Sequence, residues 1–470
     1  GSAPAAATGF PCGSAPRRYV IVWLAVTLSA GLVGWLLRGP VGTALAGWDA
    51  AHVCARLGLL CFLLVGILLA GGAVWWAVAH HLRRGVKYAL RHWQLCRGIK
   101  RALMEAGYGI PVVEQYYRLP SVKIHFSDKG LTCGLVKIQN HIKSDTSLST
   151  VNLSSALGVY LVDAQYISDD NNYYCYEISD SRIDRQLCFD SYAALADYAH
   201  KHTDKYGLYT LFMDGRNEGI KIRSMLLVGI TGSGKSYALM GLIAQLLDWP
   251  VPPVMYYADP KGSDIAVLGG TLAPERTADD IDGIIDLLRA FYGSMMERKA
   301  EMRDRLNGKL GADFTDFRLP AYIFLFDEFA AFQASIAKDK KRRDEVEELL
   351  RNVILMGRQL GFFVWIAMQK SDSSDIPTAI RDNLPLKICL GNAPSTTLIT
   401  IFGRSSDLPS RHWGKGQGLV YCDGITAAPR PVSFPALNFD IFAELTKPKQ
   451  DSQSEGVNRA EREENGTPVM

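Results

Sequence analysis

The sequence predicts an α/β protein with a mostly parallel sheet, preceded by two transmembrane helices and a small α+β domain. A glycine-rich phosphate-binding motif joins a strand pattern to a helix pattern within residues 225–247. After it, apolar strand patterns alternate with helix patterns, which is typical of a parallel sheet with helices on both faces. Before it, two uncharged apolar runs lie within the first 80 residues.

The two apolar runs predict transmembrane helices within 19–80. Tyr19–Leu37 and Leu57–Ala79 contain no charged residue. At ~1.5 Å per residue, each is about long enough for a hydrocarbon core of ~30 Å. The alternative for the first run, a cleaved signal peptide, has a shorter apolar stretch and is not followed at once by a second span. We expect a short outer loop near residues 39–55.

Basic residues flank both runs and predict the orientation. Arg17 and Arg18 precede the first run, and a larger group follows the second: Arg83, Arg84, Lys87, Arg91, Arg97, Lys100 and Arg101. Lys and Arg accumulate on the cytoplasmic side of membrane helices. We therefore expect a multi-pass protein of the plasma membrane, with the tail 1–18 and the chain after residue 80 in the cytoplasm. The second group also suits anionic lipid headgroups.

The composition of the remaining chain says less about its function than its motifs do. The 470 residues are enough for two or three domains, and a net charge of +3 does not by itself indicate a nucleic-acid binder. The nine cysteines include no C-x-x-C pair and no zinc-site spacing, which favours free thiols in a reducing compartment.

Residues 81–205 predict a basic helix followed by a small α+β domain, which we call the membrane-proximal domain. The basic helical pattern from Arg83 to about Gly107 continues the second span or lies on the membrane surface. Period-two patterns then predict strands, and helical patterns lie around them. The strands are Val122–Phe126, Leu131–Ile138, Tyr160–Ile167 and Tyr173–Ile178, and the helices are Ser149–Leu157 and Ser191–His202. No catalytic group of residues stands out here.

Residues 206–446 predict the α/β domain, and 447–470 a polar tail that cannot bury a core and is expected to be disordered. A hairpin over Tyr209–Ile222 leads into the phosphate-binding motif. The later strands are Val254–Ala258, Ala321–Asp327, Phe362–Gln369 and Leu386–Leu390, and the later helices are Ala278–Arg303 and Asp344–Leu360.

The phosphate-binding motif reads G-x-x-x-x-G-K-S and consists of Gly229, Ile230, Thr231, Gly232, Ser233, Gly234, Lys235 and Ser236. Its glycines allow successive N–H groups to turn toward phosphate oxygens, and the following helix presents its positive end. Lys235 would reach the β- and γ-phosphates of ATP, and Ser236 would bind Mg²⁺. The alternative is a chance glycine-rich loop between a strand and a helix, but the intact G-K-S and the correct pattern on both sides favour the phosphate-binding motif.

A second motif completes the nucleotide site. The apolar segment 322–326 ends in Asp327 and Glu328, a Walker B pattern. Asp327 would hold Mg²⁺, and Glu328 is the candidate general base for the attacking water. Gln369, at the end of another apolar strand, is placed to sense the γ-phosphate or position the water. Asp259-Pro260-Lys261 follows the strand after the P-loop helix, and Lys261 would face the site or a neighbouring subunit.

Six segments in this order, LLVGITGSGKS, ADPKG, FLFDEFA, GRQLGFFVWIAMQ, AIRDNLPLKI and GQGLVY, resemble the FtsK/SpoIIIE family of DNA-pumping ATPases. The resemblance covers roughly Tyr209–Leu437. It implies a RecA-like core, ATP hydrolysis with Mg²⁺, a homo-hexameric ring and passage of DNA through its pore. By motif, it implies that Arg358 or Arg381 acts across a subunit interface. The S-R-T motif of the family is absent, since Ser395-Thr396-Thr397 stands there, and Arg404 is a further candidate.

The arrangement of two spans, a small domain and one P-loop domain is most similar to FtsK-like coupling proteins of Gram-positive conjugative elements. This implies a membrane-anchored DNA translocase that works with a relaxase and transfer-channel proteins. The alternatives are a protein-export motor like those of type VII secretion, a chromosome-segregation pump, and a membrane scaffold that uses nucleotide only as an assembly switch. The basic run Lys338, Lys340, Lys341, Arg342 and Arg343 is a candidate DNA contact in a pore loop, or else a solvated helix start.

Overall fold

The computed structural model describes Ser29 and residues 48–108, 110–113, 116–140, 153–183, 185–201, 207–215, 219–247, 249–306, 311–369, 376–403, 408–409 and 411–447. Apart from Ser29, the first predicted transmembrane segment lies outside the described residues, as do Arg404 and nearly all of the tail 447–470. The chain divides into two compact units, Gly1–Leu161 with Ile167–Asp180, and Val162–Tyr166 with Ser181–Met470. We call the second the P-loop unit.

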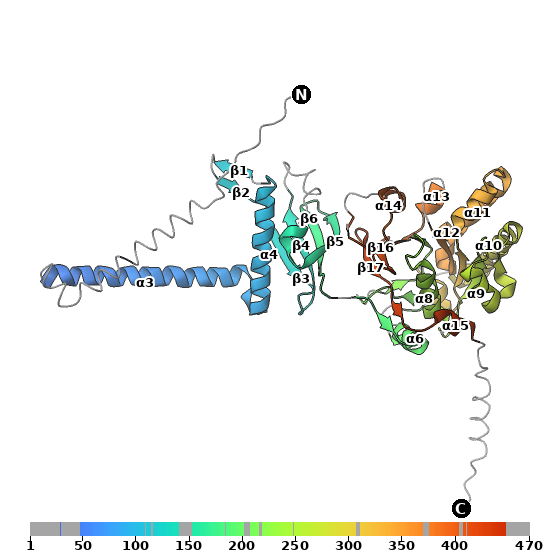
Figure 1. Ribbon diagram of the computed structural model, residues 1–470, viewed down its shortest axis with the longest axis horizontal. Helices are drawn as coiled ribbons and strands as arrows, with labels where there is room; N and C mark the ends of the chain where they lie inside the picture. The colour runs from blue at the N-terminus through green and yellow to red at the C-terminus, as the bar shows by residue number, and fades with distance from the viewer. Residues whose placement is uncertain are drawn as a thin grey trace, which may run out of the picture. The chain divides into compact units, whose positions relative to one another are not determined.

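Among the residues of the first unit that the structure describes, one helix is long and apolar enough to cross a membrane (Figure 1). This helix, α3, runs over Trp48–Ala79. Its Phe62–Ala79 window has a mean hydropathy of 2.2, and only 6% of it is buried. The prediction of an outer loop near 39–55 is wrong for residues 48–55, because the helix extends through them.

The basic segment after α3 forms a helix of its own. A 3₁₀ turn, η1 (Leu82–Arg84), separates α3 from α4 (Val86–Glu105). His81 and Gly85 flank this turn with φ angles of 56° and 112°, which no α-helix contains. The helix α4 therefore does not continue α3, and it buries one apolar face.

Four antiparallel strands form the sheet of the membrane-proximal domain, in the order β3-β4-β6-β5. Their bounds are β3 (Val122–Phe126), β4 (Cys133–Gln139), β5 (Tyr160–Ile167) and β6 (Tyr173–Asp180), close to those predicted. The short helix α5 (Ser154–Leu157) precedes β5, and β1 (Ile110–Val113) pairs with β2 (Tyr116–Arg118) separately.

Residues 181–201, assigned from sequence to the membrane-proximal domain, lie in the P-loop unit. Here β7 (Cys188–Phe189) pairs with β18 (Ala436–Leu437), and α6 (Tyr192–Lys201) packs against α8 (Lys235–Leu247). These two contacts, β7 with β18 and α6 with α8, join residues 181–201 to the P-loop unit.

Eight strands build the large sheet of the P-loop unit, in the order β12-β11-β13-β14-β10-β15-β16-β17. The first six strands run parallel to one another, and the pairs β15–β16 and β16–β17 are antiparallel. Their bounds are β10 (Met225–Gly229), β11 (Val254–Ala258), β12 (Thr277–Ala278), β13 (Tyr322–Phe326), β14 (Phe362–Met368), β15 (Leu386–Leu390), β16 (Gln417–Cys422) and β17 (Arg430–Ser433). The predicted mixed α/β class with a mostly parallel sheet is confirmed.

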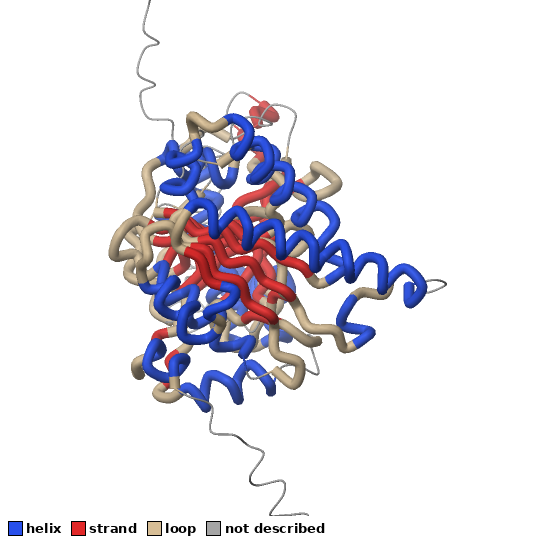
Figure 2. The backbone as a smooth tube through the Cα atoms, turned by 90° about the vertical axis from the view of Figure 1, so that its right-hand side faces the viewer, coloured by secondary structure: helices blue, strands red, loops and turns tan. Residues whose placement is uncertain are grey.

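Helices cover both faces of this sheet, as Figure 2 shows. Besides α6 and α8 they are α9 (Asp264–Leu272), α10 (Ile281–Leu306), α11 (Phe329–Ile336), α12 (Lys340–Leu360), α13 (Thr378–Arg381), α14 (Ser395–Phe402) and α15 (Ile441–Thr446). A small hairpin, β8 (Thr210–Leu211) and β9 (Ile220–Lys221), precedes β10, and two 3₁₀ turns, η3 (Pro274–Arg276) and η4 (Phe314–Phe317), lie in connections.

The strand order decides which residues meet. Every residue of β10 and β14 is buried, so these strands are fixed by the core on both faces. The strand β14 lies between β10 and β13, with Val228 level with Met368 and Phe326 level with Ile366. Because the carboxyl ends of parallel strands lie at one edge, the segments after β10, β11, β13 and β14 share one site.

Two helix glycines give opposite predictions for stability. A Cβ at Gly357 of α12 would lie 2.3 Å from the backbone oxygen of Phe362, whereas a Cβ at Gly293 of α10 meets nothing within 4 Å. We expect Gly357→Ala to lower the free energy of unfolding by about 1–3 kcal/mol through overpacking. Gly293→Ala should raise it by roughly 0.5–1 kcal/mol through helix propensity. Thermal melts of the two purified variants test this, and equal shifts would contradict the packing of α12 on β14.

Candidate nucleotide site

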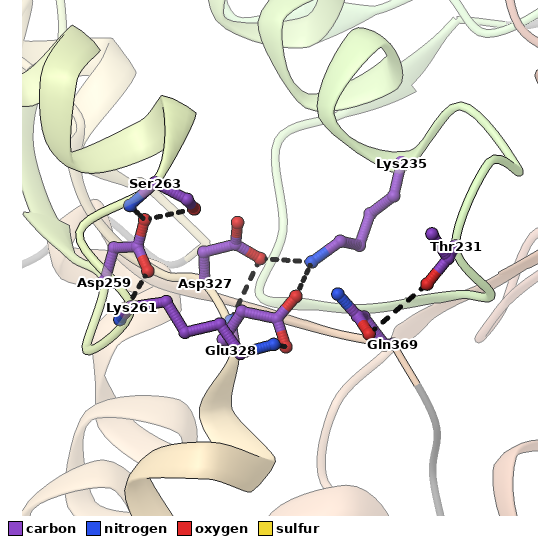
Figure 3. A network of polar contacts seen from close by, with 8 residues as sticks. All are labelled: Thr231, Lys235, Asp259, Lys261, Ser263, Asp327, Glu328 and Gln369. Carbon is purple, nitrogen blue, oxygen red and sulfur yellow. Dashed lines mark hydrogen bonds and ion pairs between the residues drawn. The ribbon is translucent and has the colours of Figure 1, made fainter.

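The P-loop connects the central strand β10 to helix α8 (Figure 3). Gly232 and Gly234 take φ angles of 82° and 93°, which only glycine adopts readily. A Cβ on Gly234 would lie 2.9 Å from the backbone nitrogen of Gly416. That nitrogen donates a hydrogen bond to the Ser233 carbonyl over 2.7 Å, so the segment before β16 helps to fix the backbone of the P-loop.

Lys235 lies between the two carboxylates of the Walker B motif. Its Nζ is 2.5 Å from Oδ1 of Asp327 and 3.0 Å from Oε1 of Glu328. All three side chains are less than a tenth exposed. The structure thus joins the ends of β10 and β13 through one ammonium group, and both predicted motifs meet in one site.

Glu328 has an unusual backbone and two cationic partners. Its φ and ψ are 52° and 39°, the left-handed region, at the N-cap of α11. Such conformations in residues other than glycine concentrate at functional sites. Burial raises the pKa of the Glu328 carboxyl, but hydrogen bonds and charge from Lys235, and then from Lys261, outweigh it and bring the pKa below its ordinary value. The side chain is therefore an ionised carboxylate at neutral pH.

Asp327 is perturbed in the opposite direction. Burial raises the pKa of its carboxyl, and the charge and hydrogen bond of Lys235 offset this only in part, while Glu328 and Asp259 add repulsion. The ionised form of Asp327 is therefore disfavoured in the folded chain without a further cation. This is the environment expected of a carboxylate that binds a metal ion together with its ligand.

Lys261 approaches the site from β11, the strand on the other side of β13. Its Nζ is 3.0 Å from Oε2 of Glu328 (Figure 3). The preceding Asp259 is fully buried and accepts the N–H groups of Lys261 and Ser263 at 3.0 and 2.8 Å and the Ser263 hydroxyl at 2.6 Å. The sequence singled out Lys261 without a partner. No local pattern reveals that its contact is Glu328.

Gln369 follows β14 and therefore emerges between the P-loop and the Walker B residues. The Thr231 hydroxyl donates to its Oε1 over 3.4 Å, a long contact (Figure 3). The Gln369 side chain is exposed at the opening of the site. Its position matches that expected of a group that senses the γ-phosphate or positions the water, a role that stays a prediction.

Arg358 and Arg381 lie away from this site. Arg358 is in the last turn of α12, just before β14 begins, and Arg381 ends α13, just before β15. They are thus at the amino-end edge of the sheet. Since β14 has seven residues at ~3.3 Å each, roughly 20 Å separates the two edges. Arg381 also forms an ion pair with Asp382 at 3.0 Å. Neither arginine reaches the P-loop of its own chain.

The basic run 338–343 is mostly helical, and the expectation of a pore loop is wrong for Lys340 to Arg343. Asp339 caps α12 by accepting the Arg342 N–H at 3.1 Å, so the helix begins at Lys340. Arg342 pairs with Asp282 at 2.7 Å and Arg343 with Asp344 at 3.6 Å. Within the part of the chain that the structure describes, Lys338, Lys340 and Lys341 form no ion pair.

The donor set fits Mg²⁺ brought in with a nucleotide. Among the described residues, no group of three or more His, Cys, Asp or Glu side chains could hold a metal by itself. Magnesium in nucleotide enzymes is typically held by one or two carboxylates and by substrate phosphates. Ser236 and Asp327 would supply the oxygen donors of such a site, and Mg²⁺ there would neutralise charge on the phosphates.

Part of this chain is similar in sequence to FtsK proteins. The chain is 31% identical over 183 residues to the FtsK domain-containing protein YdcQ of Bacillus subtilis (strain 168), covering 39% of this chain and 37% of that relative. It is 24% identical over 223 residues to the DNA translocase FtsK of Staphylococcus aureus (strain Mu50), covering 44% of this chain and 27% of that relative. The resemblance to FtsK/SpoIIIE proteins is confirmed, and the matches span well under half the length of these relatives.

Two solved structures are among those that match parts of the chain. The conjugation coupling protein TcpA of pCW3, with ATPγS, matches at a TM-score of 0.46 and 20% identity over 75% of this chain and 99% of that chain. The type VII secretion ATPase EccC of Thermomonospora curvata matches at a TM-score of 0.39 and 18% identity over 51% of this chain and 30% of that chain. No family model matches the chain.

The opposite pKa shifts of the two carboxyls predict opposite effects on stability without nucleotide. At pH 7.5, Asp327→Asn removes a charge that the fold disfavours, and Glu328→Gln removes one that it favours. The apparent Tm should therefore rise for Asp327→Asn and fall for Glu328→Gln.

The pH dependence of stability provides the control for these two variants. The stability from ionised Glu328 is present above its ordinary pKa of ~4.3 and is lost as the pH falls through its lower value in the folded chain. The deficit of Glu328→Gln relative to the parent should therefore shrink in acid. Melts in which both variants shift in the same direction would contradict the assignment.

Proposed function

We propose that this chain is a membrane-anchored ATPase that moves DNA, and that it acts as the coupling protein that delivers DNA to a conjugative transfer channel. One observation carries the ATPase assignment: Lys235 of the P-loop lies between Asp327 and Glu328 at the carboxyl edge of the sheet. The DNA assignment is supported by similarity to the DNA translocase FtsK and to an FtsK domain-containing protein.

Each residue of the site has a role in this proposal. Backbone N–H groups of 229–236 and Lys235 bind the phosphates of ATP, and Ser236 and Asp327 hold Mg²⁺. Glu328 accepts the proton of the attacking water, which Gln369 positions. An arginine from a neighbouring subunit, Arg358 or Arg381, stabilises charge on the phosphates, which requires a ring of identical chains.

The membrane helices complete the proposal. The segments Tyr19–Leu37 and Leu57–Ala79 anchor the chain in the plasma membrane, with both ends and the P-loop unit in the cytoplasm. The window Phe62–Ala79 of α3 has the length and hydropathy for this role. A relaxase and the proteins of the transfer channel would be the partners. A protein-export motor with the same fold is the rival that the experiments below exclude or support.

Substitutions in the site test the ATPase assignment. Lys235→Ala should abolish both nucleotide binding and turnover, because it removes the cation that meets the phosphates. Glu328→Gln should keep nucleotide binding and lower kcat by about 10²- to 10⁴-fold, the contribution typical of a general base. Turnover by the purified full-length chain measures both effects. Lys221→Ala, which removes a surface ion pair with Asp313, is the control and should match the parent. A Lys235→Ala variant with parental turnover would refute the assignment.

Salt dependence tests DNA contact at the start of α12. The triple variant Lys338→Gln/Lys340→Gln/Lys341→Gln should lower the slope of log K against log salt by roughly 1 per lysine that contacts phosphate. Arg342→Gln/Arg343→Gln, whose guanidinium groups already pair with carboxylates, is the matched control and should change the slope less. Nucleotide affinity should be unchanged in both. If the parent and the triple variant bind DNA with equal affinity at every salt concentration, this segment does not contact DNA. If DNA does not change the rate of ATP turnover, the protein-export alternative is favoured.

A further inference from the structure

Glu328 receives one cation on each of its two carboxylate oxygens. Lys235 contacts Oε1 at 3.0 Å from the β10 side, and Lys261 contacts Oε2 at 3.0 Å from the β11 side. The strand order β11-β13-β14-β10 makes this possible, because β13 carries Glu328 between the strands that lead to the two lysines. Figure 3 shows the carboxylate between them.

The backbone that carries Lys261 is fixed by a buried charge. Asp259 is fully buried, and three hydrogen bonds from the turn after β11 end on its carboxylate. Gly262 closes the turn with a φ of 62°, and its N–H donates to the Asp259 carbonyl at 3.0 Å. A buried carboxylate is costly unless its hydrogen bonds are made. The fold thus holds the Lys261 backbone in one place relative to the end of β13.

A purely structural role does not account for this contact. The Lys261 side chain is 46% exposed, and ion pairs with an exposed partner add little to stability. Glu328, in contrast, is 8% exposed and already has Lys235 as a buried partner. The contact gains importance only when Lys235 moves away from Glu328.

Nucleotide binding creates that situation. The P-loop lysine serves the β- and γ-phosphates when a nucleotide is bound, so it cannot hold Oε1 of Glu328 at the same time. Lys261 does not belong to the P-loop and keeps its contact with Oε2. The charged groups that face Glu328 are Lys235, Lys261 and the adjacent Asp327. Once Lys235 binds phosphate, Lys261 is the cation that remains to orient the Glu328 carboxylate.

We propose that Lys261 is a positioning residue for Glu328, and that it holds the carboxylate in the orientation for attack by water when nucleotide takes Lys235 away. The proposal rests on the proposed ATPase function and deepens it. Lys261 acts through Glu328 and does not contact the nucleotide. The bonds made and broken in hydrolysis are unchanged, and the proton from water still goes to Glu328.

Two readouts separate this role from a structural one. In Lys261→Met, an uncharged side chain of similar length, kcat should fall about 10- to 100-fold because the base is misplaced, while nucleotide affinity stays within about twofold. The acidic limb of the kcat profile should move to higher pH, because removal of a nearby cation raises the pKa of a carboxyl.

The conservative variant and a matched control complete the experiment. Lys261→Arg keeps the charge with a different geometry, so it should restore the acidic limb and recover only part of kcat. Lys221→Met removes an ion pair of the same length, 3.0 Å, from a lysine of similar exposure, 44%, and should match the parent in all readouts. The purified full-length chain in detergent is used throughout, with fluorescent ATP analogue titrations for affinity.

The outcomes distinguish this inference from the proposed function. If the parent shows no turnover that depends on Lys235, the proposed function fails. If the parent turns over ATP but Lys261→Met keeps its kcat and pH profile, only the role of Lys261 fails. If Lys261→Met binds nucleotide more weakly but keeps its kcat, Lys261 is a nucleotide ligand. If Lys261→Met has a higher kcat than the parent, Lys261 slows hydrolysis. Each of these two results overturns the proposal.

Discussion

The site depends on one buried ammonium group, Lys235, placed between two buried carboxylates. Each of these charges alone would be strongly disfavoured in the core, and removal of Lys235 would leave the two carboxylates without their buried cation. Their mutual contacts, with Lys261 at the rim, allow the ends of β10 and β13 to be held together. A nucleotide that takes Lys235 must therefore rearrange Glu328 and Asp327, so binding and the state of the base are coupled through one side chain.

Local patterns predicted the elements with the largest apolar content. β11, β15 and the Walker B strand fall at or within a residue of the expected bounds because each is a short apolar run between turn residues. The edge strand β12 has two residues and no pattern. The helix predicted from Asp344 begins four residues earlier, at Lys340, because Asp339 caps it ahead of the first apolar residue, Val346.

Strand order and distant contacts could not be predicted from local patterns. Nothing in residues 362–369 says that β14 lies between β10 and β13, yet this insertion brings Gln369 to the P-loop. The contact between Lys261 and Glu328 joins segments that follow different strands, and the hydrogen bond from Gly416 to Ser233 joins residues that are far apart in the sequence. The motifs therefore identify the chemical groups of the site, and the packing of the sheet determines which of them touch.

The two edges of the sheet separate the groups of one chain from those of a neighbour. The carboxyl-end edge holds the P-loop, both carboxylates and Lys261. The amino-end edge holds Arg358 and Arg381, about a strand length away. No side-chain rotation brings these arginines to the phosphates of their own chain. If either arginine acts on ATP, it does so in a second copy, and hydrolysis in this protein then requires assembly.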